Sequence, residues 1–234
     1  MLGGFVSHAR FVTTMILTVN IGLFLATMLY SMRAGNENLM DIDGQTLFQF
    51  GAKYREAIVR GQWWRLITAG FLHGGLFHIL MNSWVLFDLG AQVEEVFGAR
   101  RLIVIYFVSN ILGFFASAWW SPALSIGASA GIFGLIGAMI AFGTTSGTSM
   151  GSAVSGLYIR WAIYGLLMGL LPFFAIDNAA HLGGLAGGFI TGFLTGQPRA
   201  RREMETFWAI AAGLCLAITA YAFLKMFLWF SIAG

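Results

Sequence analysis

The sequence is short of charge, proline and cysteine. Charged residues make up 10% of its 234 residues, against about 25% in an average soluble domain. So few charges cannot cover a globule of this size, which excludes a disordered chain, an ordinary water-soluble enzyme and a nucleic-acid binder with a basic face. The 3 prolines argue against a flexible linker rich in glycine and proline. The single Cys215 excludes an intramolecular disulfide and any cysteine-based metal site.

Apolar side chains are what the sequence has in abundance. They account for 58% of the residues, and the mean hydropathy is +0.79. The 31 glycines suit helices that approach one another closely within a membrane. Seven apolar stretches are each near the ~20 residues that a membrane-spanning helix needs: 11–32, 75–96, 101–120, 125–144, 157–175, 179–197 and 206–230. We therefore predict an all-α polytopic membrane protein.

Arginines near the ends of these stretches predict the orientation. Arg10, the pair Arg100 and Arg101, and the cluster within 199–202 fall on one side if the seven helices alternate. Because loops rich in Lys and Arg stay in the cytoplasm, we expect the N-terminus there, and the C-terminus and the long loop 33–74 outside. That loop is rich in apolar residues, so we expect a structured element in the outer interface, with Trp63 and Trp64 at headgroup level.

Polar side chains inside apolar stretches need a reason, because they are costly in lipid. His78 and Asn82 are four residues apart and share one helix face near the start of the second stretch. One interpretation is a pair of interhelical hydrogen bonds that hold the bundle together. Asp88, midway along the same stretch, is a second costly group, and the sequence offers no evident partner for it.

Ser129 lies at the start of the fourth stretch, among Gly127, Gly131, Gly134 and Ala138. These small residues recur at i, i+4, i+7 and i+11 and predict a face that another helix approaches at backbone contact. Backbone N–H groups in the first turn of a helix lack intrahelical partners, so those beside Ser129 are able to stabilise an oxyanion. A membrane serine taken alone is more often a local hydrogen-bonder; the setting of this one favours a chemical role.

His181 lies at the start of the sixth stretch, with Gly184 and Gly188 on the same face. A lone histidine in a membrane helix is more often structural. Two glycine faces at one membrane level, however, predict that the two helices pack closely and that Ser129 and His181 meet. A serine needs a base to become a nucleophile, and neutral imidazole supplies it. Asp177, four residues before His181, is a weak candidate for a third member.

Three sets of residues, taken in order, resemble the motifs of the rhomboid intramembrane serine proteases. The first runs from Gly61-Gln62-Trp63-Trp64-Arg65-Leu66 through Phe71-Leu72-His73 to His78 and Asn82, and continues with Leu89-Gly90, Glu94 and Gly98-x-Arg100. The second is Gly127-x-Ser129 with Gly134, and the third is Ala180-His181 with Gly184 and Gly188. They span residues 51–188. Each motif alone is weak, whereas the ordered set is highly specific.

The resemblance implies an architecture and a set of roles. It implies a six-helix catalytic core in residues 1–200, including the interfacial loop 33–74, and an additional C-terminal transmembrane helix in 201–234. The implied catalytic dyad is Ser129 as nucleophile and His181 as general base. The implied oxyanion hole comprises His78, Asn82 and the Ser129 N–H. The implied supporting residues are Phe133, packed on the base histidine, Arg65 and Glu94, tied to the integrity of the loop, and His73, Gly184 and Gly188.

One position departs from the family pattern. The residue after the serine is usually glycine in the family but is Ala130 here, with glycine displaced to Gly131. Alanine is penalised at a position that requires a positive φ, whereas it is well suited to a helix. We expect Ala130 to be helical and tolerated.

The resemblance also implies what the protein acts on. The implied substrates are transmembrane segments of other membrane proteins, bound within the lipid bilayer, and the fifth stretch, with Trp161, Tyr164 and Phe173, is the candidate lateral gate. No cofactor, metal ion or nucleic acid is implied. The expected location is a bacterial inner membrane.

Other functions are weighed against the protease. A zinc protease of the membrane needs H-E-x-x-H, and no histidine of this sequence is followed by glutamate. An intramembrane aspartyl protease needs two facing aspartates, and the only candidates, Asp88 and Asp177, lie at different depths. A transporter favours inverted repeats and polar groups near the midplane, and neither is evident. A catalytically inactive rhomboid relative that binds membrane clients remains the main alternative.

Overall fold

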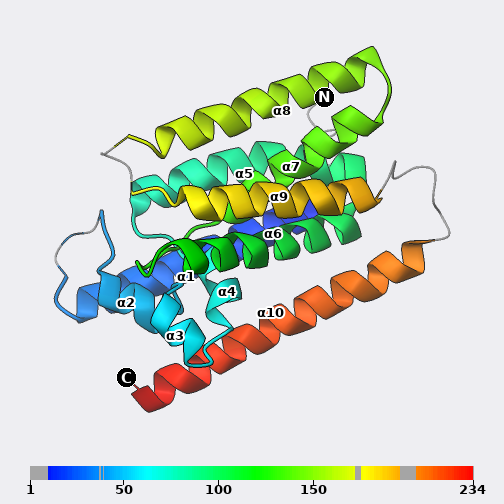
Figure 1. Ribbon diagram of the computed structural model, residues 1–234. Helices are drawn as coiled ribbons and strands as arrows, with labels where there is room; N and C mark the ends of the chain where they lie inside the picture. The colour runs from blue at the N-terminus through cyan, green and yellow to red at the C-terminus, as the bar shows by residue number, and fades with distance from the viewer. Residues whose placement is uncertain (1–9, 37, 39, 172–174, 196–203, 234) are drawn as a thin grey trace, which may run out of the picture.

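The computed structural model describes residues 10–36, 38, 40–171, 175–195 and 204–233. Long helices dominate it (Figure 1): α1 (Phe11–Arg33), α5 (Leu76–Phe97), α6 (Ala99–Trp120), α7 (Ser129–Thr145), α8 (Ser149–Met168), α9 (Asn178–Thr195) and α10 (Glu205–Ala233). Shorter elements lie between α1 and α5: α2 (Gly44–Gln49), α3 (Arg55–Val59), α4 (Arg65–Thr68) and the 3₁₀ turn η2 (Ala69–Phe71). The described residues form no strand, only two isolated bridges. The predicted all-α fold is confirmed.

Four helices of the described chain are long and apolar enough to cross a membrane. They are α1, α5, α6 and residues Glu205–Ile232 of α10, whereas Ser129–Thr145 is a shorter apolar helix. α7 is short because it lies in the centre of the bundle, surrounded by other helices and almost entirely buried. A helix covered by protein on all sides does not need the length or the apolar outer face that lipid demands.

Two helix boundaries differ from those expected. α8 begins at Ser149 and ends at Met168, whereas the sequence suggests 157–175. Its first turns are rich in small polar residues and therefore resemble a loop, but the Thr148 hydroxyl caps them by accepting a hydrogen bond from the Gly151 N–H at 3.0 Å. α7 begins at Ser129 and not at 125, because the chain turns at Gly127, which has a φ of +125°.

Glycine allows α7 and α9 to pack at backbone contact. A Cβ atom at Gly188 would lie 1.8 Å from the carbonyl oxygen of Gly134, and one at Gly184 would lie 2.1 Å from that of Ala130. Either position therefore admits only glycine at this spacing. The predicted close approach of two small-residue faces is confirmed, and it brings the starts of α7 and α9 together.

The segment between α1 and α5 is folded and closes the end of the bundle at which α5, α7 and α9 begin. We call residues 34–75 the cap loop. Its main chain binds both neighbouring segments: the Leu76 N–H of α5 donates to the Met40 carbonyl at 3.2 Å, and the Gly127 N–H donates to the Ala69 carbonyl at 3.0 Å. The expectation of a structured element is confirmed. The expected headgroup position is wrong for Trp64, which is 3% exposed because it packs against Trp229 of α10.

The opposite end of the bundle is held by two buried charged side chains. Glu94 accepts hydrogen bonds from the backbone N–H groups of Val12 and Thr13, each at 3.0 Å, and so caps the start of α1. The expectation that Glu94 supports the cap loop is therefore wrong: its carboxylate satisfies helix donors at the far end. Arg101 of α6 forms an ion pair with Glu205 of α10 at 2.6 Å.

Candidate active site

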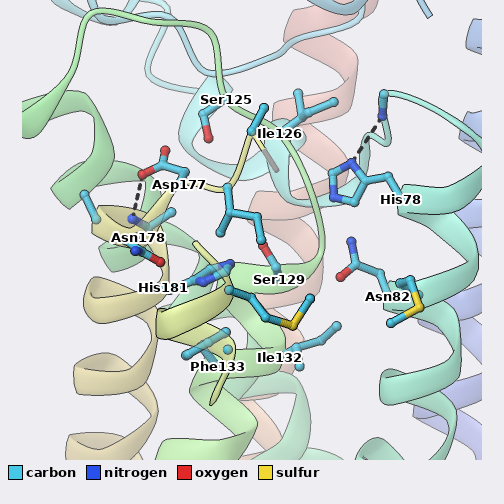
Figure 2. Close-up of a pocket in the computed structure, with 18 of the residues that line it drawn as sticks. His78, Asn82, Ser125, Ile126, Ser129, Ile132, Phe133, Asp177, Asn178 and His181 are labelled. Carbon is cyan, nitrogen blue, oxygen red and sulfur yellow. Dashed lines mark hydrogen bonds between the residues drawn. The ribbon is translucent and has the colours of Figure 1, made fainter. Parts of the chain in front are cut away.

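A cavity of about 1210 Å³ lies beneath the cap loop, between α5 and α8. Ser129, His181, His78 and Asn82 all line it, and Figure 2 shows them gathered around one space. Its two sides are apolar: Phe77, Met81 and Val85 belong to α5, and Trp161, Tyr164 and Met168 belong to α8. The structure thus brings together four polar residues from three helices inside an apolar enclosure.

Ser129 is the first residue of α7 and is placed by a short extended segment that the cap loop holds. Lys53 and Ser125 exchange two backbone hydrogen bonds, at 2.9 and 3.0 Å. Gly127 follows, and a Cβ atom there would lie 2.8 Å from Nε2 of His78 and 3.6 Å from Oγ of Ser129. A side chain at position 127 would therefore fill the space between these two groups, which explains why the motif has glycine there.

His181 lies in the first turn of α9, and its ring stacks on Phe133 of α7. The two ring centroids are 4.0 Å apart at an interplanar angle of 15°, so Phe133 packs on the histidine as the resemblance implies. Figure 2 shows the imidazole beside the Ser129 side chain. His181 is 5% exposed, and its Nδ1 atom has no hydrogen-bond partner in the described residues. The ring is fixed by stacking instead of by a carboxylate.

Asp177 does not complete a triad in the described structure. One carboxylate oxygen accepts a hydrogen bond from the Ala180 N–H at 3.0 Å, which caps α9, and the other accepts one from the Ser117 hydroxyl. Burial alone would raise the pKa of the Asp177 carboxyl, but hydrogen bonds from Ser117, Ser125 and Ala180 and the charge of Lys53 lower it below its ordinary value. Asp177 is therefore an ionised N-cap that positions the helix carrying His181.

His78 and Asn82 face the cavity from α5, opposite Ser129 (Figure 2). Nδ1 of His78 accepts a hydrogen bond from the Gly74 N–H at 3.4 Å, which leaves Nε2 toward the cavity. The Asn82 Nδ2 group is buried and has no hydrogen-bond partner in the described residues. The interhelical hydrogen bond that would hold the bundle together is thus absent from the described contacts of this amide, whose side chain lines the cavity.

His73 packs against the ring of His78. It is fully buried, and its ring meets that of His78 edge-on with centroids 5.1 Å apart. Burial lowers the pKa of His73 to about 3, so its imidazole stays neutral at physiological pH. His73 does not line the cavity, and its contact acts on the orientation of His78.

Ala130 is accommodated without strain. It lies within α7, and no residue other than glycine has a positive φ in the described chain. The displaced glycine has a different task, because a Cβ atom at Gly131 would lie 2.4 Å from the ring of Tyr106. The expectation that Ala130 is helical is confirmed.

Lys53 is a buried residue near the site that reasoning from the sequence missed. Its ammonium donates to the carbonyls of Ser121 at 3.0 Å and Ala123 at 2.7 Å, and the side chain is fully buried. Burial lowers the pKa of Lys53 below its ordinary value. A lysine in a loop carries no signal of burial in the sequence. Only the fold shows that Lys53 fixes the main chain of residues 121–123, which leads to Ser129.

Comparisons with known proteins point to one family. A family model described as the rhomboid domain matches residues 60–198. The rhomboid protease GluP of Bacillus subtilis is 36% identical over 69% of this chain and 33% of its own length. Rhomboid-like protease 1 of Toxoplasma gondii is 35% identical over 76% of this chain and 63% of its own. Inactive RHOMBOID-like protein 8 of Arabidopsis thaliana is 36% identical over 66% and 45%. The chain thus spans between a third and two thirds of the length of these relatives.

Proposed function

Because the chain belongs to the rhomboid family, we propose that it is an intramembrane serine protease with Ser129 as nucleophile and His181 as base. The observation that carries the proposal is the meeting of these two side chains in one buried cavity, on helices packed at glycine contact. The family includes relatives named inactive, but this chain retains both groups. Phe133 holds the imidazole in place without a third catalytic residue.

The proposed reaction is acyl transfer in two steps. The imidazole of His181 takes the hydroxyl proton of Ser129 while the oxygen attacks the peptide carbonyl, and the protonated ring then gives that proton to the leaving amine as the C–N bond breaks. In the second step His181 takes a proton from water, the hydroxide attacks the acyl-enzyme, and the proton returns to Ser129. The cap-loop end of the cavity, with polar Asp177 and Ser125, is the side from which water enters.

The oxyanion hole consists of His78, Asn82 and the Ser129 N–H. As the first residue of α7, Ser129 has a backbone N–H without an intrahelical acceptor. The unpartnered Asn82 amide faces the same cavity. Preorganised donors of this kind stabilise the charge that develops on the carbonyl oxygen.

The proposed substrates are transmembrane segments that enter from the bilayer between α5 and α8. The mouth of the cavity is lined by outward-facing apolar side chains, among them Phe77 of α5 and Tyr164 of α8. α8 packs mainly on α7 and makes little contact with α5, so few interactions oppose their separation. Trp161 and Tyr164 lie on this proposed gate, and Phe173 lies outside the described residues.

One side-chain hydrogen bond holds α8 against α5 below the cavity. The Tyr158 hydroxyl of α8 donates to Oε1 of Gln92 in α5 at 2.8 Å, and Nε2 of Gln92 donates to Asp88 at 3.0 Å. Asp88 thereby gains a partner that the sequence did not reveal. Among the described residues this bridge is the one side-chain hydrogen bond between α5 and α8, so it opposes their separation.

Tyr158→Phe is therefore expected to raise kcat/KM for a transmembrane substrate by about 2–5-fold, because one interhelical hydrogen bond is lost and the ring is kept. The measurement is cleavage in liposomes. A short soluble peptide that reaches the site without passing between the helices serves as the control and is expected to be cut at an unchanged rate. An unchanged or lower kcat/KM for the transmembrane substrate contradicts the role of the bridge.

The protease proposal itself is tested with the purified full chain in liposomes and a single-span substrate. Release of two fragments from wild type, and none from Ser129→Ala, supports it. Intact substrate that binds wild type without being cut favours the inactive, client-binding alternative.

We also propose a division of the chain and a location for the protein. Residues 1–200 form the catalytic core and 201–234 the additional helix, in a bacterial inner membrane with the N-terminus cytoplasmic. The arginines at the far end of the bundle support this orientation. A C-terminal reporter that is active only outside the cytoplasm is expected to be active; an inactive one, beside a functioning cytoplasmic reporter, contradicts the orientation.

A further inference from the structure

Arg65 is the central residue of the cap loop. Its side chain is fully buried and donates to the carbonyls of Phe48 at 2.6 Å and Ala52 at 2.9 Å and to the side chain of Gln62 at 2.6 Å. One guanidinium thus joins α2, the segment between α2 and α3, and the start of α4. A buried cation needs compensation beyond these bonds.

Aromatic rings supply that compensation, and one of them comes from α10. The guanidinium carbon lies 4.0 Å from the ring centroid of Phe48, 4.6 Å from that of Trp64 and 5.0 Å from that of Trp229. Trp229 also meets Phe48 edge-on, with centroids 5.6 Å apart. We call these three rings the Arg65 cage. Its third wall is separated from the rest by more than 150 residues of sequence and belongs to the helix that lies outside the six-helix bundle.

α10 is anchored at both ends by the same chemistry. At its start, Glu205 pairs with Arg101, whose guanidinium lies 5.4 Å from the ring of Trp208. At its end, Trp229 closes the Arg65 cage, and this end of α10 packs beside α4 (Figure 1). Between the anchors, α1, α6 and α10 enclose a cavity of about 240 Å³. The middle of α10 is therefore loosely packed, and its two ends carry the specific contacts.

The Arg65 cage is connected to the nucleophile by a short path. Arg65 begins α4, and Ala69 follows directly after that helix. The Ala69 carbonyl accepts the hydrogen bond from Gly127, two residues before Ser129. On its other side the Met40 carbonyl of the cap loop accepts a hydrogen bond from the Leu76 N–H at the start of α5, the helix that carries His78. A displacement of α4 therefore moves both the nucleophile and the oxyanion hole.

We propose that α10 is a brace for the active site, and that Trp229 is a positioning residue that fixes α4, and through it Ser129, by completing the Arg65 cage. The proposal rests on the proposed protease function for its effect on catalysis, but the effect on the cap loop stands without it. The brace acts from outside the cavity, so it changes turnover and leaves substrate binding nearly intact.

The experiment compares Trp229→Ala, Trp229→Leu and Trp229→Phe with Phe227→Ala in the full chain. Phe227 is in the same turn of α10 but is 62% exposed and touches no ring in the described contacts, so it is the matched control. Two experiments are carried out in liposomes. The first measures amide hydrogen exchange of residues 48–72, and the second measures kcat and KM for a transmembrane substrate. Trp229→Ala and Trp229→Leu are expected to speed exchange of the cap loop by about 10-fold, the size expected for one desolvated cation–π partner. They are expected to lower kcat by about 10-fold with KM changed less than about 3-fold.

Trp229→Phe keeps an aromatic ring in the Arg65 cage, so its hydrogen exchange and kcat are expected to stay near the wild-type values. Phe227→Ala is expected to leave both at the wild-type values. Trp229→Leu keeps apolar volume, so it remains informative if Trp229→Ala does not fold. Unchanged exchange in both Trp229→Ala and Trp229→Leu overturns the brace, and so does an equal effect of Phe227→Ala. If wild type cuts nothing and exchange still rises in Trp229→Leu, the protease proposal fails and the brace on the cap loop stands.

Discussion

Ser129→Ala and His181→Ala are each expected to lower the cleavage rate of a transmembrane substrate by an order of 10⁴–10⁶-fold while leaving the protein folded. Alanine removes the proposed nucleophilic oxygen in the first case and the proposed base in the second. Neither change disturbs the glycine contacts between α7 and α9, which are made by other residues. Single-turnover cleavage in liposomes, with thermal unfolding measured on the same samples, separates lost chemistry from lost folding.

The double variant sharpens this expectation. Nucleophile and base act as a unit, so Ser129→Ala combined with His181→Ala is expected to be little worse than either single change. Multiplicative losses would show that the two residues act independently. A Ser129→Ala protein that still cuts near the wild-type rate removes the assignment altogether.

Asn82→Ala is expected to lower kcat by about 10²–10³-fold, the loss that follows removal of one oxyanion donor. Its side chain lines the cavity, and its Nδ2 group is buried and unpartnered in the described residues. Because the hydrogen bond to substrate is strongest in the transition state, KM is expected to change much less than kcat. The measurement is kcat and KM on purified variant with its melting temperature.

The opposing interpretation of Asn82 predicts a different pattern. If the amide holds helices together, its removal costs roughly 0.6–2 kcal/mol of stability, and activity follows the folded fraction. Ser83→Ala is a matched control on the same turn of α5, since Ser83 does not line the cavity. A destabilised Asn82→Ala protein with normal turnover per folded molecule contradicts the oxyanion role and leaves the dyad unaffected.

Long-range patterns in the sequence predicted the all-α fold, and they predicted that Ser129 and His181 lie on closely packed helices. Apolar stretches of membrane length located the long helices, because lipid allows few alternatives to a continuous helix. The glycine faces around Ser129 and His181 predicted close packing, since only glycine permits backbone contact between helices. Helix ends were less certain where the signal was local: the small polar residues that begin α8 resemble a loop until the Thr148 cap is seen.

These sequence patterns did not predict the contacts between side chains that lie far apart in the sequence. The burial of Trp64 depends on Trp229, and the role of Glu94 depends on the unpaired N–H groups of α1. The burial of Lys53 depends on two carbonyls just ahead of the nucleophile segment. Each of these is a polar or amphipathic side chain whose partner is fixed only once the helices are placed, so hydropathy and spacing carry no trace of the pairing.

The proposed dyad is tested most directly by a fluorophosphonate probe, which forms a covalent bond only with an activated serine. After labelling of the full chain in membranes, the modified peptide is identified by mass spectrometry. The expected result is a single adduct on Ser129 that is absent from both Ser129→Ala and His181→Ala. Labelling of another serine, such as Ser125 at the rim of the same cavity, or undiminished labelling of His181→Ala, would contradict a Ser129–His181 dyad.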